Sequence, residues 1–363
     1  MSSMAVEFNA INLSQGFPDF PVPQELIHLV NQYMRKGYNQ YAPMAGVPKL
    51  LDALSAKLEE SYCYKVKANS EITITAGATE GIFATIMALV QAGDEVIVFD
   101  PAYDSYEPAI LLAGGKAVHV PLEFPSFSIN WERLRKAVNS KTKMIIINTP
   151  HNPSGAVLSN EDVKELETIV ENHDVILLSD EVYEHIIFDG KTHNSILKSD
   201  ILRNKGIAIF SFGKTFHATG WKVGYVVAPP YLSAEIQKVH QYLTFSVNTA
   251  VQYALADFLR ESNHYKRLPD LFQGKREFFM GLLRNSRFKP IGGGGTYFQL
   301  LSYEEISSKG DMEMAEWLLK EKGVASIPIS VFYEDKTDNR ILRFCFAKHQ
   351  ETLEKAAAIL CKV

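Results

Sequence analysis

The chain contains a polar stretch, directly after the apolar run Gly206-Ile207-Ala208-Ile209-Phe210, that runs Ser211-Phe212-Gly213-Lys214-Thr215-Phe216-His217-Ala218-Thr219-Gly220-Trp221-Lys222-Val223-Gly224. The apolar run is short and rich in β-branched residues, which predicts a buried strand. The polar stretch therefore lies at the carboxyl end of a strand, where open α/β sheets bind their ligands. Its glycines, serine and lysines suit an anionic ligand, with one amine left for other chemistry. A P-loop is excluded, because it needs glycine where this chain has Ala208.

Length and composition restrict the class of protein. A chain of 363 residues exceeds the usual size of a single core, so we expect one large and one smaller domain. The net charge of -5 offers no electrostatic attraction to nucleic acid, so the expected partners are small molecules. The N-terminus has no secretory pattern and no apolar run is long enough to span a membrane, so we expect a cytoplasmic protein that does not bind membranes.

Cysteine and histidine spacing argues against disulfides and metals. The three cysteines, Cys63, Cys345 and Cys361, are far apart and odd in number, which is typical of a reducing compartment. The histidines show no spacing typical of zinc ligands, so we expect no metal site.

Strands and helices alternate through the middle of the chain. We predict strands over 72–75, 95–99, 117–121, 143–148, 175–178, 206–210 and 225–228. Helices are predicted between several of them, over 82–90, 109–113, 131–138 and 160–172. This alternation predicts an α/β fold with a largely parallel central sheet that is covered by helices on both faces.

The two ends of the chain are expected to form a second domain. Residues 13–21 contain a glycine and prolines and predict an extended arm that packs through its apolar side chains, followed by a helix. After the glycines at 292–295 we predict strands over 296–301, 324–327 and 340–347, with a helix over 311–322 and another at the C-terminus. The expected division is 1–40 and 281–363 in a small α+β domain, and 41–280 in a large ligand-binding domain.

Polar residues follow several predicted strands. The turn 77–79 between a strand and a helix is an anion site or, equally well, a tight turn capped by Thr79. Asn152 lies between two prolines, which restrict its backbone. Asp180 ends an apolar run and needs a cation or good donors, either a ligand or an internal partner. Arg343 lies in an apolar strand and needs a carboxylate, internal or from a substrate.

Together these loop residues match the functional groups of pyridoxal phosphate. The amides of 77–79, Ser211 and Lys222 suit its phosphate, and Asp180 suits a protonated ring nitrogen. The remaining groups are a flat aromatic ring, two oriented donors and a spare amine, which we assign to Tyr103, Asn152, Tyr183 and Lys214.

Five ordered motifs carry a family resemblance: Gly-Ala-Thr-Glu-Gly (77–81), Asn-Thr-Pro-His-Asn-Pro-Ser-Gly (148–155), Ser-Asp-Glu-Val-Tyr (179–183), Ser-Phe-Gly-Lys-Thr (211–215) and Leu-Arg-Phe-Cys-Phe-Ala (342–347). Over essentially its whole length the chain resembles the fold-type I, class I/II aminotransferases. The segments 15–20, 38–41 and 238–248 are most similar to the methionine and kynurenine/glutamine branch of that family.

The resemblance implies roles for individual residues. Lys214 would bond covalently to the cofactor and serve as the base, and Asp180 would pair with its ring nitrogen. Asn152 and Tyr183 would donate to its phenolic oxygen, and Tyr103 would stack on its ring. The phosphate would be bound by Ala78, Thr79, Ser211 and Lys222, with Tyr41 reaching it from the neighbouring subunit of a homodimer with shared active sites.

The resemblance also implies the substrates and the reaction. Arg343 would pair with the substrate α-carboxylate, and Gly16, Phe17, Asn152 and Phe245 would line the rest of the substrate site. Many class I members have arginine where Lys222 stands; lysine keeps the charge without the bidentate fork, so we expect the phosphate to be held in a different geometry.

The implied activity is transfer of the α-amino group of a neutral sulfur-containing or aromatic amino acid (methionine, phenylalanine or kynurenine) to a 2-oxo acid, with ping-pong kinetics. The alternative is a carbon-sulfur β-lyase that uses the same cofactor and acts on cystathionine or cysteine S-conjugates. A cofactor-sensing transcriptional regulator is disfavoured, because no DNA-binding module precedes the strand that begins at Ile72.

Overall fold

The computed structural model describes residues 1–363. Its central sheet has seven strands, and their order is β2 (Ile72–Thr75), β8 (Gly224–Val227), β7 (Gly206–Ser211), β6 (Ile176–Asp180), β5 (Thr142–Asn148), β3 (Glu95–Asp100) and β4 (Lys116–Pro121). Strand β8 is antiparallel to both of its neighbours, and the other pairs are parallel. The prediction of a largely parallel sheet is therefore confirmed.

Helices cover both faces of this sheet. One face packs against α5 (Ala78–Leu89), α6 (Tyr106–Leu112) and α11 (Pro230–Leu243). The other face packs against α3 (Pro48–Tyr62), α7 (Trp131–Ala137), α8 (Asn160–Asn172), α9 (Asp200–Lys205) and α12 (Thr249–Phe258). Successive side chains of a strand point to opposite faces of the sheet, and β5 shows this alternation. Met144 and Ile146 pack on the face covered by α5, α6 and α11, and Ile145 and Ile147 pack on the other face.

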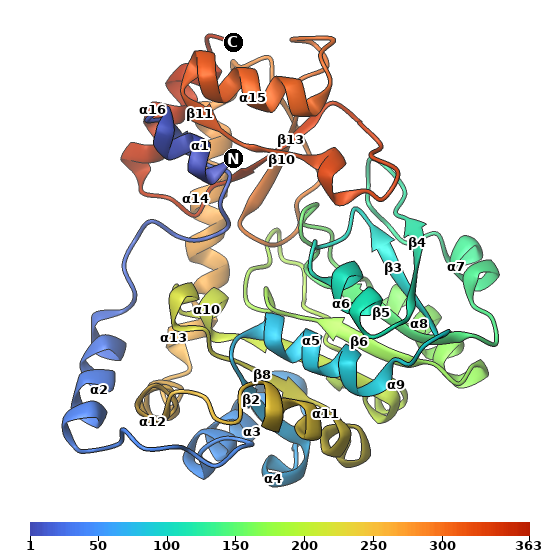
Figure 1. The fold of residues 1–363 in the computed structure, drawn as a ribbon. Coiled ribbons are helices and arrows are strands. Elements are labelled where there is room, and N and C mark those ends of the chain that lie inside the picture. Colours follow the sequence, from blue (N-terminus) through green and yellow to red (C-terminus); the bar gives the residue numbers. More distant parts are fainter.

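The two termini meet in the smaller domain, at the top of Figure 1. Its antiparallel sheet has the order β12 (Ile327–Pro328), β13 (Ile341–Cys345), β10 (Phe298–Ser302) and β9 (Lys289–Ile291). Beside it lie α1 (Ser2–Glu7), α15 (Asp311–Lys322) and α16 (Gln350–Leu360). The predicted strand over 324–327 is in fact two: β11 (Val324–Ala325) pairs with β1 (Ile11–Asn12), and β12 pairs with β13.

The division between the domains differs from the expected one at its first boundary. Helix α2 (Gln24–Arg35) was expected in the small domain with the rest of residues 1–40, but it packs against α12 of the large domain (Figure 1). Tyr33 donates a hydrogen bond to Asp257, and Lys49 Nζ lies 2.7 Å from the same carboxylate. Burial of Leu26 and Tyr33 therefore attaches α2 to the large domain, whereas β1 belongs with the small one.

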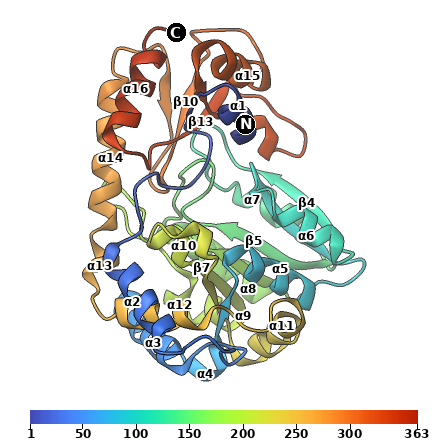
Figure 2. The same ribbon diagram turned by 60° about the vertical axis from the view of Figure 1, so that its left-hand side comes forward.

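One long helix connects the two domains. Helix α14 (Leu268–Leu282) runs along one side of the molecule from the large domain to α16 (Figure 2). No helix is both long and apolar enough to cross a membrane. The remaining short elements are α4 (Ala68–Glu71), α10 (Phe212–Thr215), α13 (Asn263–Lys266), η1 (Ile196–Lys198), η2 (Thr219–Trp221) and η3 (Ile329–Phe332).

Candidate active site

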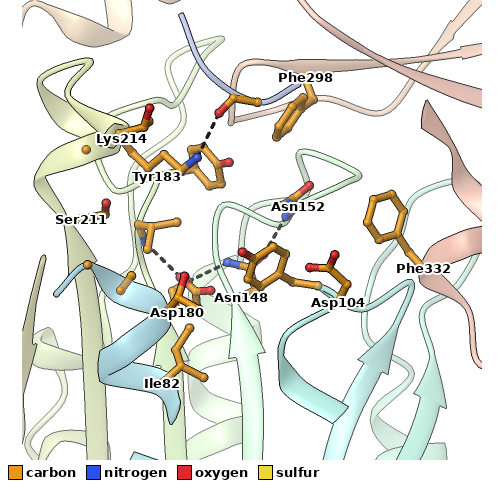
Figure 3. A pocket seen from close by; sticks show the side chains of 18 of the residues that line it. Ile82, Asp104, Asn148, Asn152, Asp180, Tyr183, Ser211, Lys214, Phe298 and Phe332 are labelled. Carbon is orange, nitrogen blue, oxygen red and sulfur yellow. Dashed lines mark hydrogen bonds between the residues drawn. The ribbon is translucent and has the colours of Figure 1, made fainter. Parts of the chain in front are cut away.

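A cavity of about 430 Å³ opens at the carboxyl ends of β6 and β7. The small domain and the N-terminal arm complete its wall, so that side chains distant in sequence converge (Figure 3). It is lined by the predicted site residues Gly16, Ala78, Thr79, Tyr103, Asn152, Asp180, Tyr183, Ser211, Lys214, Lys222 and Arg343.

One end of the cavity is suited to an anion. Gly77, the residue before α5, has φ +81°, and Lys222 Nζ would lie 3.4 Å from a Cβ placed at Gly77. Because the first amides of α5 have no partner within the helix, they and the Lys222 ammonium form a positive cradle, with Ser211 on the same wall. Gly224 permits the close approach, since a Cβ there would lie 2.8 Å from the nitrogen of Ala78.

Asp180 is a buried carboxylate at the end of β6. Its Oδ2 accepts a hydrogen bond of 2.7 Å from the hydroxyl of Tyr106, and its Oδ1 accepts one of 3.3 Å from the amide of Val182. Burial raises its pKa to about 6, although these two hydrogen bonds and the charge of Lys214 oppose the shift. Asn148 supports the backbone by donating to the Asp180 carbonyl at 2.9 Å.

Lys214 extends from α10 into the same cavity. Its Nζ donates to the Tyr297 hydroxyl at 2.9 Å and to the Gly16 carbonyl at 3.1 Å; Figure 3 shows the second contact. Burial lowers the pKa of this amine to about 8, and the charges of Arg343 and Lys222 act in the same direction. The charges of Cys345 and Asp180 oppose that shift. The ammonium form therefore still predominates at pH 7, but the neutral amine is far more accessible than that of an ordinary lysine.

Arg343 is buried on β13 and has no carboxylate partner in the chain. Its Nη1 donates to Asn152 Oδ1 at 2.6 Å, and its Nη2 donates to the Ser14 carbonyl at 3.2 Å. Its Nε is buried without any partner. The guanidinium carbon lies 3.9 Å from the ring centroid of Phe298, which holds the side chain in place. A buried cation with a free N–H is suited to a carboxylate ligand.

Two aromatic side chains complete the site. Tyr183 is buried and lies edge-on to Tyr297, with 5.2 Å between the ring centroids, and burial raises its pKa. Tyr103 is half-buried and packs edge-on against Tyr106 at 5.6 Å. Both residues line the cavity.

Three residues predicted for the site lie outside this cavity. Tyr41 is 82% exposed, and its ring lies 5.3 Å from that of Phe245, which is also exposed. Phe17 is also exposed, and Lys348 Nζ donates to its carbonyl at 2.8 Å and lies 4.7 Å from its ring. The expectation that Phe17 and Phe245 line the substrate pocket is therefore not met within one chain.

Sequence reasoning missed other residues of the cavity and its hydrogen-bond network, namely Asn148, Tyr106, Tyr297, Phe298 and Phe332. Asn148 could have been found from its place at the end of β5. The other four required knowledge of how helix α6 and the small domain pack. No cluster of three metal-ligating side chains is present.

Comparison with known proteins gives one consistent family. Residues 9–360 match the family described as aminotransferase class I and II. The chain is 49% identical to the methionine aminotransferase of Escherichia coli, with 98% of this chain and 93% of the relative covered. It is 36% identical to a kynurenine–oxoglutarate transaminase of Dictyostelium discoideum, with 100% and 92% covered.

A solved structure agrees with this match. The crystal structure of YbdL from Escherichia coli, described as having a methionine aminotransferase function, superposes with a TM-score of 0.98 at 48% identity and covers 100% of this chain and 95% of that one. The family and the fold make the protein a pyridoxal-phosphate-dependent aminotransferase of fold type I. The chain therefore belongs to the class I and II aminotransferases.

Proposed function

We propose that the enzyme moves the α-amino group of methionine, or of an aromatic amino acid such as phenylalanine or kynurenine, to a 2-oxo acid. The observation that supports this most directly is the composition of the cavity wall beside Arg343, where the small domain contributes Phe298, Ile327, Val331 and Phe332. Such a wall favours an apolar or aromatic substrate side chain once Arg343 has bound the α-carboxylate. The names of the relatives, methionine aminotransferase and kynurenine–oxoglutarate transaminase, agree with this choice.

The residues present fit pyridoxal phosphate. The cradle at Gly77 and Lys222 suits the phosphate, together with Ala78, Thr79 and Ser211. Asp180, a buried carboxylate with no cation bonded to it, suits a protonated ring nitrogen. When bound, this cofactor supplies an aldehyde that bonds amines and a ring that accepts an electron pair.

The chain's own groups then have distinct tasks. We assign Lys214 as the covalent partner of the cofactor and as the base that removes the proton from the substrate α-carbon. With the cofactor bound, Asp180 would keep the ring nitrogen charged, and Asn152 and Tyr183 would donate to the phenolic oxygen. Tyr103 would pack on the ring, and Arg343 would orient the amino acid through its carboxylate.

To test this proposal, amino transfer is measured from a panel of amino acids to several 2-oxo acids. Transfer from methionine, phenylalanine or kynurenine is expected, with ping-pong kinetics. Absence of transfer from all three would contradict the substrate assignment. Release of ammonia and pyruvate from cystathionine without any 2-oxo acid would instead identify the β-lyase. Lys214→Ala is expected to abolish both transfer and the visible absorbance of the lysine-linked cofactor.

We further propose a homodimer in which Tyr41 of each subunit contributes to the partner's phosphate site. Tyr41 is exposed beside Phe245, and it lines a surface hollow together with Met34 and Tyr38; all four side chains are exposed. Such a patch on a soluble enzyme is typical of an interface. A second copy of the chain accounts both for this patch and for the position of Tyr41 outside its own cavity.

We also place the enzyme in the cytoplasm. Its cysteines are all unpaired, and Cys63 and Cys361 are exposed. Exposed free thiols are typical of a reducing compartment, in which they do not form disulfides. Fractionation of the native host's cells with an antibody to the chain would test this assignment.

A further inference from the structure

Tyr297 is a fully buried residue, just before β10, that no sequence motif singled out. Its hydroxyl lies between two groups of the active site: it accepts a hydrogen bond from Lys214 Nζ at 2.9 Å and donates one to the carbonyl oxygen of Gly16. Lys214 Nζ also donates directly to the Gly16 carbonyl, at 3.1 Å. Three elements from distant parts of the sequence therefore meet at one amine.

The number of hydrogens fixes the direction of these bonds. A tyrosine hydroxyl carries one proton, and here it is donated to Gly16, so its oxygen acts only as an acceptor toward Lys214. A neutral lysine amine has two N–H bonds and one lone pair. With one N–H on the Tyr297 oxygen and the other on the Gly16 carbonyl, the lone pair is the only group left to face the cavity.

We propose that Tyr297, together with the Gly16 carbonyl, orients the free Lys214 amine so that its lone pair faces the substrate. This inference rests on the proposed role of Lys214 as the base. When that base acts, the substrate C–H bond breaks, its electron pair stays on the substrate side, and the lone pair of Nζ forms the new N–H bond. The two existing N–H bonds remain on their acceptors throughout, so the amine does not need to turn.

The surroundings hold both acceptors firmly. The ring of Tyr297 packs edge-on against Tyr183 with centroids 5.2 Å apart. A side chain at position 16 would force a shift of the arm or of the Phe298 ring, since a Cβ there would lie 2.5 Å from Cζ of Phe298. The arm is fixed on either side of Gly16, where the Leu13 carbonyl accepts from the Cys345 amide at 2.8 Å and the Phe17 carbonyl accepts from Lys348 Nζ at 2.8 Å. The carbonyl of Gly16 therefore has little freedom to leave the amine.

Tyr297→Phe removes the hydroxyl and keeps the ring, and Tyr303→Phe is the matched control. Tyr303 is equally buried in the small domain, but its hydroxyl donates to the Lys309 carbonyl and it does not line the cavity. In the holoenzyme we expect Y297F to lower kcat for methionine about 10- to 100-fold, with little change in KM, because the lost hydrogen bond is one to a group that becomes charged as it takes the proton. The isotope effect with α-deuterated methionine should rise, because proton transfer becomes slower, and Y303F should match the wild type.

A second measurement needs no catalytic activity. In the full-length chain without cofactor, we expect acetic anhydride to modify Lys214 severalfold faster in Y297F than in wild type or Y303F, as followed by peptide mass spectrometry. The reason is that loss of an acceptor for the N–H bonds destabilises the ammonium form. If Y297F does not fold, Gly16→Ala replaces it, because the added Cβ displaces the other acceptor, and the same two changes are expected.

The outcomes separate this inference from the proposed function. If wild-type protein transfers no amino group from any donor, the proposed function fails, and the labelling experiment still tests Tyr297. If the wild type is active and Y297F equals Y303F in both isotope effect and labelling rate, the role of Tyr297 is overturned.

Discussion

The hydroxyl of Tyr106 donates a hydrogen bond of 2.7 Å to Oδ2 of Asp180, and both side chains are buried. Burial alone would favour the protonated form of Asp180, and its pKa is raised to about 6. The hydrogen bond from Tyr106 acts in the opposite direction, because it stabilises the carboxylate. Tyr106 thereby keeps Asp180 charged at neutral pH, which is the state needed to pair with a protonated ring nitrogen.

Tyr106→Phe is therefore expected to raise the pKa of Asp180 further. A larger fraction of the carboxyl group is then protonated at any given pH, so activity on the acid side should be lost at higher pH than in wild type. The expected displacement is about 1 to 2 pH units, because a hydrogen bond to a charged group contributes about 1.5–3 kcal/mol. The measurement is the pH profile of kcat/KM.

A matched control exists for this variant. Tyr265 is also buried and donates to a carboxylate, Glu60 Oε2, at 2.9 Å, but it does not line the cavity. Tyr265→Phe should lose activity on the acid side of the kcat/KM profile at the same pH as wild type. Coincident profiles for Y106F and wild type would contradict the role assigned to Tyr106.

Arg343→Lys should weaken substrate binding selectively. Lysine keeps the positive charge but lacks the planar guanidinium group of arginine. That group bonds to Asn152 and to the Ser14 carbonyl and still has an N–H free for a ligand, which a lysine ammonium cannot match. We expect KM for methionine to rise about 10- to 100-fold, with unchanged affinity for the cofactor as measured by fluorescence titration. Arg276→Lys is the control: Arg276 also binds a carboxylate, that of Asp189, through two nitrogens, but away from the cavity. Equal KM values in R343K and R276K would refute the assignment.

The central sheet and the strand-end residues were predictable because their signals are local. Parallel strands end at one edge, so Asp180 and Ser211 could be placed together without knowledge of side-chain packing. Helix boundaries were predictable where the caps are strong. Ser159 forms a capping box at the start of α8, and Gly323 has φ +76° at the end of α15.

The remaining features depend on tertiary packing. Phe298 and Phe332 reach the cavity only because the small domain packs over the carboxyl edge of the large sheet. Helix α2 follows the arm directly in sequence, yet its buried residues Leu26 and Tyr33 attach it to the other domain. No local pattern distinguishes these arrangements, since an apolar stripe on a helix shows that it packs but not against what.

Glu184 follows β6 and forms a buried ion pair, and breaking this pair should destabilise the fold strongly. Lys57 Nζ lies 2.5 Å from Glu184 Oε1, both side chains are buried, and Tyr62 donates to the other carboxylate oxygen. Lys57→Met would leave Glu184 buried without its ammonium partner. We expect a loss of about 3–5 kcal/mol in the free energy of unfolding, measured with denaturant at pH 7.

The pH dependence of this loss has a definite sign. Burial raises the pKa of Glu184, but the charges of His185 and Lys57 outweigh it, so the net pKa lies below the usual 4.5. Its stabilising contribution is present above that usual value and is lost as pH falls toward the depressed pKa. The difference between wild type and K57M should therefore shrink below about pH 4.5. Lys136→Met, which removes the exposed pair with Glu132, should change stability little at either pH, and an equal effect of both variants would contradict the argument.

Mixed dimers test whether Tyr41 acts across a subunit interface. Lys214→Ala and Tyr41→Ala are each expected to give weakly active or inactive homodimers. In a hybrid, one of the two sites would combine an intact Lys214 with Tyr41 of the partner subunit, because a two-fold axis repeats each contact. Co-expression of K214A and Y41A with distinct affinity tags should therefore restore activity. With random pairing, the expected activity is about one quarter of wild type. Co-expression of two differently tagged K214A chains should restore none. If Tyr41 served its own subunit, no hybrid site would be complete and the mixture would show no gain over the separate variants.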